Sequence, residues 1–135
     1  MLFFVSGIFI ILHGLVHLLY FGQSRRIFEL QPGMTWPDGS WALSKLVGDE
    51  ATRSLASALC ILTAIVLVAG GIGLFAKWSL WRPIVISGSV LSTIAYLLLW
   101  DGKLKGLDNQ GGIGILINLA ILASLLIFQW PKFEA

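Results

Sequence analysis

The stretch Leu12-His13-Gly14-Leu15-Val16-His17-Leu18 lies inside an apolar run from Leu2 to Phe21 and is the strongest indication of the fold. An α-helix repeats every ~3.6 residues, so side chains four positions apart share a face, as His13 and His17 do. The run is about as long as the ~20 residues that a bilayer crossing requires. Ionisable groups at that depth are rare and face a bundle interior or a wet cavity. The stretch therefore predicts a membrane-spanning helix with a buried polar site.

The composition is typical of a protein that resides in lipid. Of the 135 residues, 57% are hydrophobic and 12% are charged, whereas soluble domains carry about 25% charged residues. The length corresponds to a single domain, 1–135. The net charge of +2 is too small and too scattered to indicate a nucleic-acid partner. The single cysteine, Cys60, excludes an intrachain disulfide and any multi-cysteine metal site.

Four apolar segments, about 2–22, 54–76, 83–100 and 112–130, each approach spanning length. The first connection, 23–53, is the long one. Within it, a serine cap and a glycine terminator bracket a short helix near 40–47 that would lie on the membrane surface. We therefore expect an all-α integral membrane protein, built as a four-transmembrane-helix up-down bundle with a short interfacial helix in the long first loop.

The charge distribution does not fix the orientation of this bundle. With four spans, the connections 23–53 and 101–111 share one membrane side, called here the loop face, and both termini lie on the other. The loop face carries six basic residues against three on the opposite side, which favours a cytoplasmic loop face. Six acidic residues nearly cancel that charge, and even-span proteins commonly keep both termini inside. Orientation stays open.

Polar residues from all four segments fall in one layer of one leaflet. Counting ~1.5 Å per residue from the loop-face helix ends places His17 about 7 Å deep, His13 about 13 Å and Asn118 about 10 Å. Tyr96, Ser57 and Cys60 fall at similar depths, with Trp100 and Asp101 just above. A polar group facing lipid is costly, so we expect these side chains to converge on one polar pocket. The candidate ligand-binding residues are His13, His17, Tyr96, Asn118, Ser57, Trp100 and Asp101.

The two histidines are compatible with several chemistries. Imidazoles at i, i+4 can chelate a divalent metal, with Asp101 or Asp108 as the candidate third ligand beside His13 and His17. Haem would need a separate iron for each histidine, because both project from one helix. His13, His17 and Asn118 could instead bind the head group of a quinone or lipid. In the structural alternative, the neutral histidines only bond to Tyr96, Asn118 or serines and hold the helices together.

The segment His13-Gly14-Leu15-Val16-His17-Leu18, with Leu99-Trp100-Asp101-Gly102-Lys103 and the helix that contains Asn118, carries a resemblance. The chain resembles a group of small uncharacterised prokaryotic four-span membrane proteins that open with His-Gly-Leu-x-His-Leu. Its layout is also DoxX-like. The resemblance implies a four-span architecture and a location in a prokaryotic cell membrane. It implies no mechanism. The long loop 23–53 has no counterpart in that group.

Three functions of different classes follow. A binding protein would hold a small apolar ligand or cofactor in a polar pocket within one leaflet. An accessory subunit would dock into a larger membrane complex. A membrane enzyme would use His13 or His17 as a general base or metal ligand. The sequence contains no nucleophile–base pair, phosphate loop or complete metal set, so the enzyme ranks last and catalytic residues stay unassigned.

Overall fold

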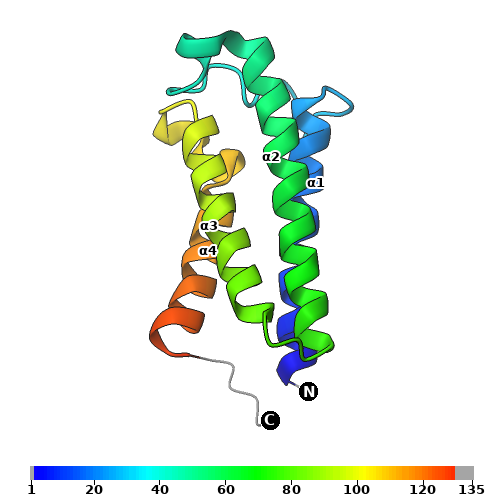
Figure 1. The fold of residues 1–135 in the computed structure, drawn as a ribbon. Coiled ribbons are helices and arrows are strands. Elements are labelled where there is room, and N and C mark those ends of the chain that lie inside the picture. The colour runs from blue at the N-terminus through cyan, green and yellow to red at the C-terminus, as the bar shows by residue number, and fades with distance from the viewer. Residues whose placement is uncertain (1, 130–135) are drawn as a thin grey trace.

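The computed structural model describes residues 2–129, which contain helices and no strand. The helices are α1 (Leu2–Ser24), α2 (Ser44–Phe75), α3 (Trp81–Leu99) and α4 (Gly112–Leu122). A 3-10 helix, η1 (Leu104–Gln110), precedes α4, and a π-helical segment, η2 (Ala123–Ile127), continues it. The four helices run alternately up and down, and each packs on the next one in the chain (Figure 1). The expectation of an all-α fold is confirmed.

Three of these helices are long and apolar enough to cross a membrane: Phe4–Ser24, Ser44–Phe75 and Trp81–Leu99. They cover the first three predicted spans. Their outer faces carry large apolar side chains at high exposure, such as Leu12 at 57%, Ile65 at 60% and Ile94 at 48%. A helix that is apolar on its outer face as well as its inner face is typical of a membrane environment. The three helices therefore indicate a membrane protein.

The fourth apolar helix is shorter than the predicted span 112–130. It comprises 11 residues of α4 and 5 of η2, or roughly 24 Å at ~1.5 Å per residue. A bilayer core is about 30 Å thick. The predicted end of this span, at residue 130, lies outside the described residues. The observed length alone does not make Gly112–Ile127 a span.

The helix α2 begins ten residues before the predicted span, because Gly48 bends the helix instead of ending it. Gly48 has φ 84° and ψ 164°, a backbone conformation that is essentially restricted to glycine. Residues 41–43 form turns and Ser44 starts α2. The segment expected as a separate interfacial helix near 40–47 is therefore a turn followed by the first turn of α2. Figure 1 shows this part of α2 running across the top of the bundle.

The long first loop caps the end of α3. Helix C-termini leave carbonyl groups without partners inside the helix. The Trp41 indole Nε1 donates to the Leu97 carbonyl at 2.6 Å, and the Trp41 backbone N–H donates to the Trp100 carbonyl at 2.8 Å. The Ser40 hydroxyl donates to the Leu98 carbonyl. The loop thus satisfies three terminal carbonyls of α3 and its cap.

The same loop is fastened to the end of α1 by buried polar contacts. Gln23 is fully buried; its Nε2 donates to the Met34 carbonyl at 3.0 Å, and its Oε1 accepts from the Leu30 N–H at 2.8 Å. Asp38 accepts ion pairs from Arg26 at 3.0 Å and Arg53 at 3.1 Å. These contacts fix the loop against α1 and α2 at the loop face.

Two apolar clusters form the core, and a polar layer separates them. The cluster toward the termini contains Ile10, Leu67, Leu74, Trp81, Val85, Ile121 and Leu125. The cluster toward the loop face contains Trp36, Ala56, Cys60, Ala95, Tyr96 and Leu99. Close contact of α1 with α2 depends on glycine at two points: a Cβ on Gly71 would lie 2.5 Å from Ile11 Cγ1, and a Cβ on Gly14 would lie 2.9 Å from Leu67 Cβ. Small residues at such positions let membrane helices approach.

Candidate functional site

Four buried side chains from α1, α3 and α4 form a closed hydrogen-bonded ring. His13 Nε2 lies 2.6 Å from Asn118 Oδ1, and Asn118 Nδ2 lies 2.9 Å from Ser92 Oγ. Ser92 Oγ lies 2.6 Å from His17 Nε2, and His17 Nδ1 lies 2.9 Å from the His13 carbonyl oxygen. Asn118 and Ser92 are fully buried, and the histidines are nearly so. We call these four residues the polar ring.

The acceptors in the polar ring determine the direction of every bond. The Asn118 Oδ1 and the His13 carbonyl oxygen only accept, so His13 Nε2 and His17 Nδ1 carry hydrogen atoms. In a neutral imidazole, His17 Nε2 is then an acceptor, and the Ser92 hydroxyl donates to it. Ser92 in turn accepts from Asn118 Nδ2. All four bonds are satisfied with both histidines neutral.

Aromatic side chains enclose the polar ring on its loop-face side. Tyr96 stacks on His17 with ring centroids 5.3 Å apart, and Tyr20 meets Tyr96 edge-on at 5.1 Å. The Tyr20 hydroxyl donates to the Asn109 carbonyl at 2.8 Å. Tyr96 is 2% exposed, so this layer separates the histidines from the loop face. The polar ring therefore lies in a dry part of the bundle.

The structure brings together only part of the residue set derived from the sequence. His13, His17 and Asn118 bond within the polar ring, and Tyr96 packs against it. The buried Ser57 hydroxyl instead pairs with Ser24 Oγ at 2.9 Å, between α1 and α2.

The last two residues of that set, Trp100 and Asp101, lie at the loop face. Trp100 Nε1 donates to the Lys103 carbonyl at 2.9 Å. Asp101 accepts from the Lys103 N–H at 2.8 Å and from Gln110 Nε2 at 3.0 Å. These bonds tie the end of α3 to η1 and do not reach the histidines.

The arrangement of the histidines favours interhelical bonding over metal chelation. Their rings are 5.3 Å apart and nearly perpendicular, at 77°. The Nε2 lone pair of His17 accepts the Ser92 hydroxyl, so a metal would have to displace that bond. Across residues 2–129, no group of three or more His, Cys, Asp or Glu side chains is placed to hold a metal ion. The candidate third ligand, Asp101, bonds to Gln110 and Lys103 instead.

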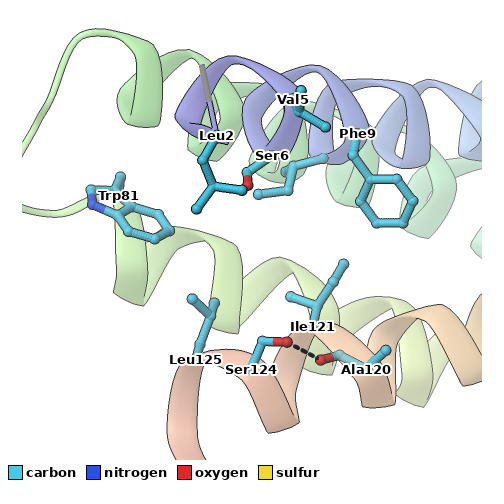
Figure 2. Close-up of a pocket in the computed structure, with 10 residues that line it drawn as sticks. Leu2, Val5, Ser6, Phe9, Trp81, Ala120, Ile121, Ser124 and Leu125 are labelled. Atoms are coloured by element: carbon cyan, nitrogen blue, oxygen red, sulfur yellow. Dashed lines mark hydrogen bonds between the residues drawn. The ribbon is translucent and has the colours of Figure 1, made fainter. Parts of the chain in front are cut away.

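An apolar cavity of about 280 Å³ lies between α1 and the helix formed by α4 and its continuation η2, and is called here the α1–α4 cavity. Figure 2 shows Leu2, Val5, Ser6 and Phe9 of α1 facing Ala120, Ile121, Ser124 and Leu125 across it, with Trp81 at one end. The Ser124 hydroxyl donates to the Ala120 carbonyl of its own helix at 2.9 Å. Phe9 also stacks on His13, with ring centroids 6.5 Å apart. The cavity thus adjoins the polar ring through Phe9.

Two features of the site were absent from the residue set derived from the sequence. Ser92 is the hydroxyl that links Asn118 to His17, and the signal for it was its place on one face of α3 with Ser89 and Tyr96. Nothing in the sequence indicated the α1–α4 cavity, because its apolar lining residues are of the same types as those on any lipid-facing helix surface.

The fold and the site define a class: a small all-helical protein with helices of membrane-spanning length and a buried ring of two histidines, an asparagine and a serine. Comparison of the chain with protein-family models, with curated proteins and with solved structures finds no match. The resemblance to the small four-span group therefore stays a prediction.

Proposed function

We propose that the protein is a four-span integral membrane protein that binds a single acyl or isoprenoid chain in the cavity between α1 and α4. The observation that carries the proposal is the apolar cavity of about 280 Å³ itself. An engineered apolar cavity of about 150 Å³ binds benzene, and ordinary ligand pockets begin near 300 Å³. The volume therefore suits a segment of one hydrocarbon chain.

The position of the cavity supports entry from the bilayer. Close helix packing joins α1 to α2, α2 to α3 and α3 to α4, which leaves α1 and α4 facing each other across the cavity. Three lining side chains of α1, Leu2, Val5 and Phe9, are 45–60% exposed. These exposed groups belong to the surface that would face lipid. A chain could therefore enter sideways without crossing the membrane surface.

The polar ring favours an apolar chain over a head group as the bound part. Recognition of a quinone carbonyl needs a free donor, and His13 Nε2 already donates to Asn118. The Asn118 amide donates one of its two N–H groups to Ser92, and its side chain is fully buried and is not among the residues that line the cavity. We infer that the polar ring lies behind Phe9, outside the cavity, and holds α4 against α1. An enzyme that uses these histidines would first have to open the ring.

Photolabelling tests the proposal. With a diazirine fatty acid in lipid nanodiscs, we expect adducts to concentrate on peptides that contain Phe9, Ile121 and Ser124. Filling the cavity by the double variant Ser6→Leu and Ser124→Leu should reduce those adducts at least about tenfold, because the added volume displaces the chain. Ala123→Leu, on the same helix but outside the lining, is the matched control and should label like wild type.

Labelling spread evenly over all exposed apolar residues would indicate ordinary annular lipid and contradict the binding proposal. Equal labelling of the filled and wild-type proteins would contradict it as well. If further membrane subunits co-purify in fixed ratio and block the labelling, the accessory-subunit function is favoured instead.

The four-span arrangement is tested with single cysteines in a Cys60→Ala background. The labelled positions are Glu29→Cys, Lys105→Cys, Ser79→Cys and Gln129→Cys, all at exposed residues. In sealed vesicles, an impermeant maleimide should label positions 29 and 105 from one side and positions 79 and 129 from the other. If position 129 is labelled from the same side as position 105, α4 does not cross the membrane and the four-span proposal is overturned.

A further inference from the structure

A second cavity, of about 250 Å³, lies at the loop face and shares no lining residue with the α1–α4 cavity. Its walls come from the long first loop, residues 31–38, and from the segment 101–110. The two walls are joined by a reciprocal amide pair: Gln31 Nε2 donates to Asn109 Oδ1 at 2.7 Å, and Asn109 Nδ2 donates to Gln31 Oε1 at 2.9 Å. The cavity is therefore a built feature of the loop face.

The first polar group of this cavity is a donor without an acceptor. Trp36 lines the cavity and is only 3% exposed, and its indole Nε1 has no hydrogen-bond partner among residues 2–129. The residue is held firmly, because Arg26 Nη1 donates to its carbonyl at 2.8 Å and Tyr20 packs on its ring at 5.0 Å. A buried N–H without an acceptor is costly. An acceptor supplied by a bound molecule would remove this cost.

The second polar group is a carboxylate without a basic partner. Two acids line the cavity, and one of them, Asp38, is neutralised by ion pairs with Arg26 and Arg53. Asp101 accepts only from the Lys103 backbone N–H and Gln110 Nε2. No ion pair to Asp101 occurs within residues 2–129. Its negative charge is available to a cation in the cavity.

We infer that this loop-face cavity binds a small primary ammonium compound that also carries a hydroxyl or carbonyl group, such as an amino alcohol. The ammonium group would donate to Asp101, and the oxygen would accept from the Trp36 indole. Taking ~30 Å³ as the share of one water molecule, the cavity has room for roughly eight heavy atoms. The inference rests on residues of the loop face and is independent of the α1–α4 cavity.

The test uses the full chain labelled with ¹⁵N-tryptophan, and the probe is ethanolamine. The Trp36 indole resonance is assigned by its loss in Trp36→Phe, with Trp78→Phe as the matched control at an exposed indole. Ethanolamine should shift that one resonance saturably. Ethanol, which lacks the ammonium group, and methylamine, which lacks the acceptor, should bind at least about tenfold more weakly.

Asp101→Asn should weaken ethanolamine binding by at least about tenfold, because it removes the charge and keeps the shape. Asp108→Asn, an exposed acid in the same segment and outside the cavity lining, should bind like wild type. Nanodiscs of phosphatidylethanolamine, compared with phosphatidylcholine and without added amine, distinguish a lipid head group from a free amine. A shift in the former alone identifies the lipid as the source.

Three results would overturn the inference. The first is a Trp36 resonance that ethanolamine does not shift saturably, which would mean that water fills the cavity. The second is an equal shift with ethanol. The third is an Asp101→Asn variant that binds ethanolamine as tightly as the wild type does. Binding is measured from the Trp36 resonance, which also reports whether the variant is folded.

Discussion

Replacing Gly111 by alanine is expected to lower the free energy of unfolding by about 2–5 kcal/mol. Gly111 has φ 96°, where a side chain is strained, and a Cβ there would overlap the ring of Tyr96. Tyr96 cannot easily move aside, because it is 2% exposed and stacks on His17. Thermal unfolding in detergent should show a clear loss of stability. The packing of the polar ring would loosen with it.

Two other glycines serve as controls that show the cost of backbone strain without the overlap with a neighbouring side chain. Gly33 and Gly39 have φ 77° and 76°, and a Cβ on either would meet nothing within 4 Å. Gly33→Ala and Gly39→Ala should therefore cost only the backbone strain, about 1–2 kcal/mol. If Gly111→Ala costs no more than these two controls, Tyr96 does not occupy the position described here.

Replacing Asn118 by leucine is expected to cost about 2–4 kcal/mol, because it leaves buried polar groups without partners. Leucine has a similar size, so the change removes two hydrogen bonds and little packing. His13 Nε2 loses its acceptor, and Ser92 loses a donor. Single interhelical hydrogen bonds in membranes average about 0.6 kcal/mol, and burial of the orphaned groups adds the rest. Thermal unfolding again provides the measurement.

Two further variants serve as controls for Asn118→Leu. Ser124→Ala also removes a polar group from the same helical segment, but its hydroxyl bonds only to Ala120 of that segment. We expect it to change stability by no more than about 0.5 kcal/mol. His13→Gln keeps a donor near Asn118 and should cost less than Asn118→Leu. A loss no larger than that of Ser124→Ala would show that the polar ring does not hold the helices together.

The fold was predictable wherever apolar length was the signal. The runs that became α1 and α3 match the predicted spans closely, since ~20 apolar residues have few other uses. The start of α2 was not predictable, because a glycine such as Gly48 more often ends a helix than lies inside one. In this structure, Gly48 has a φ of 84° and bends α2, which continues on both sides of it. Only tertiary contacts, such as the Gly39 N–H donating to Asp49 Oδ1 at 3.0 Å, select between those outcomes.

The site was predictable in depth but not in connectivity. Helical spacing placed His13, His17 and Asn118 in one layer. In the structure, Asn118 bonds directly to His13 and through Ser92 to His17. Depth alone could not assign Ser57, because a serine at that level can face any neighbour and this one faces Ser24. Trp36 gave no signal, since its buried N–H depends on how the long loop folds back over α1.

The hydrogen bond between His13 and Asn118 spans nearly the whole chain, because 105 positions separate its partners. During synthesis, the donor His13 therefore emerges from the ribosome well before the acceptor Asn118. During that interval α1, α2 and α3 can already pack on one another, while His13 lacks its acceptor. Arrival of α4 then completes the polar ring and forms the second wall of the cavity at the same moment. Assembly of the bundle and creation of its apolar site are thus one event in biogenesis.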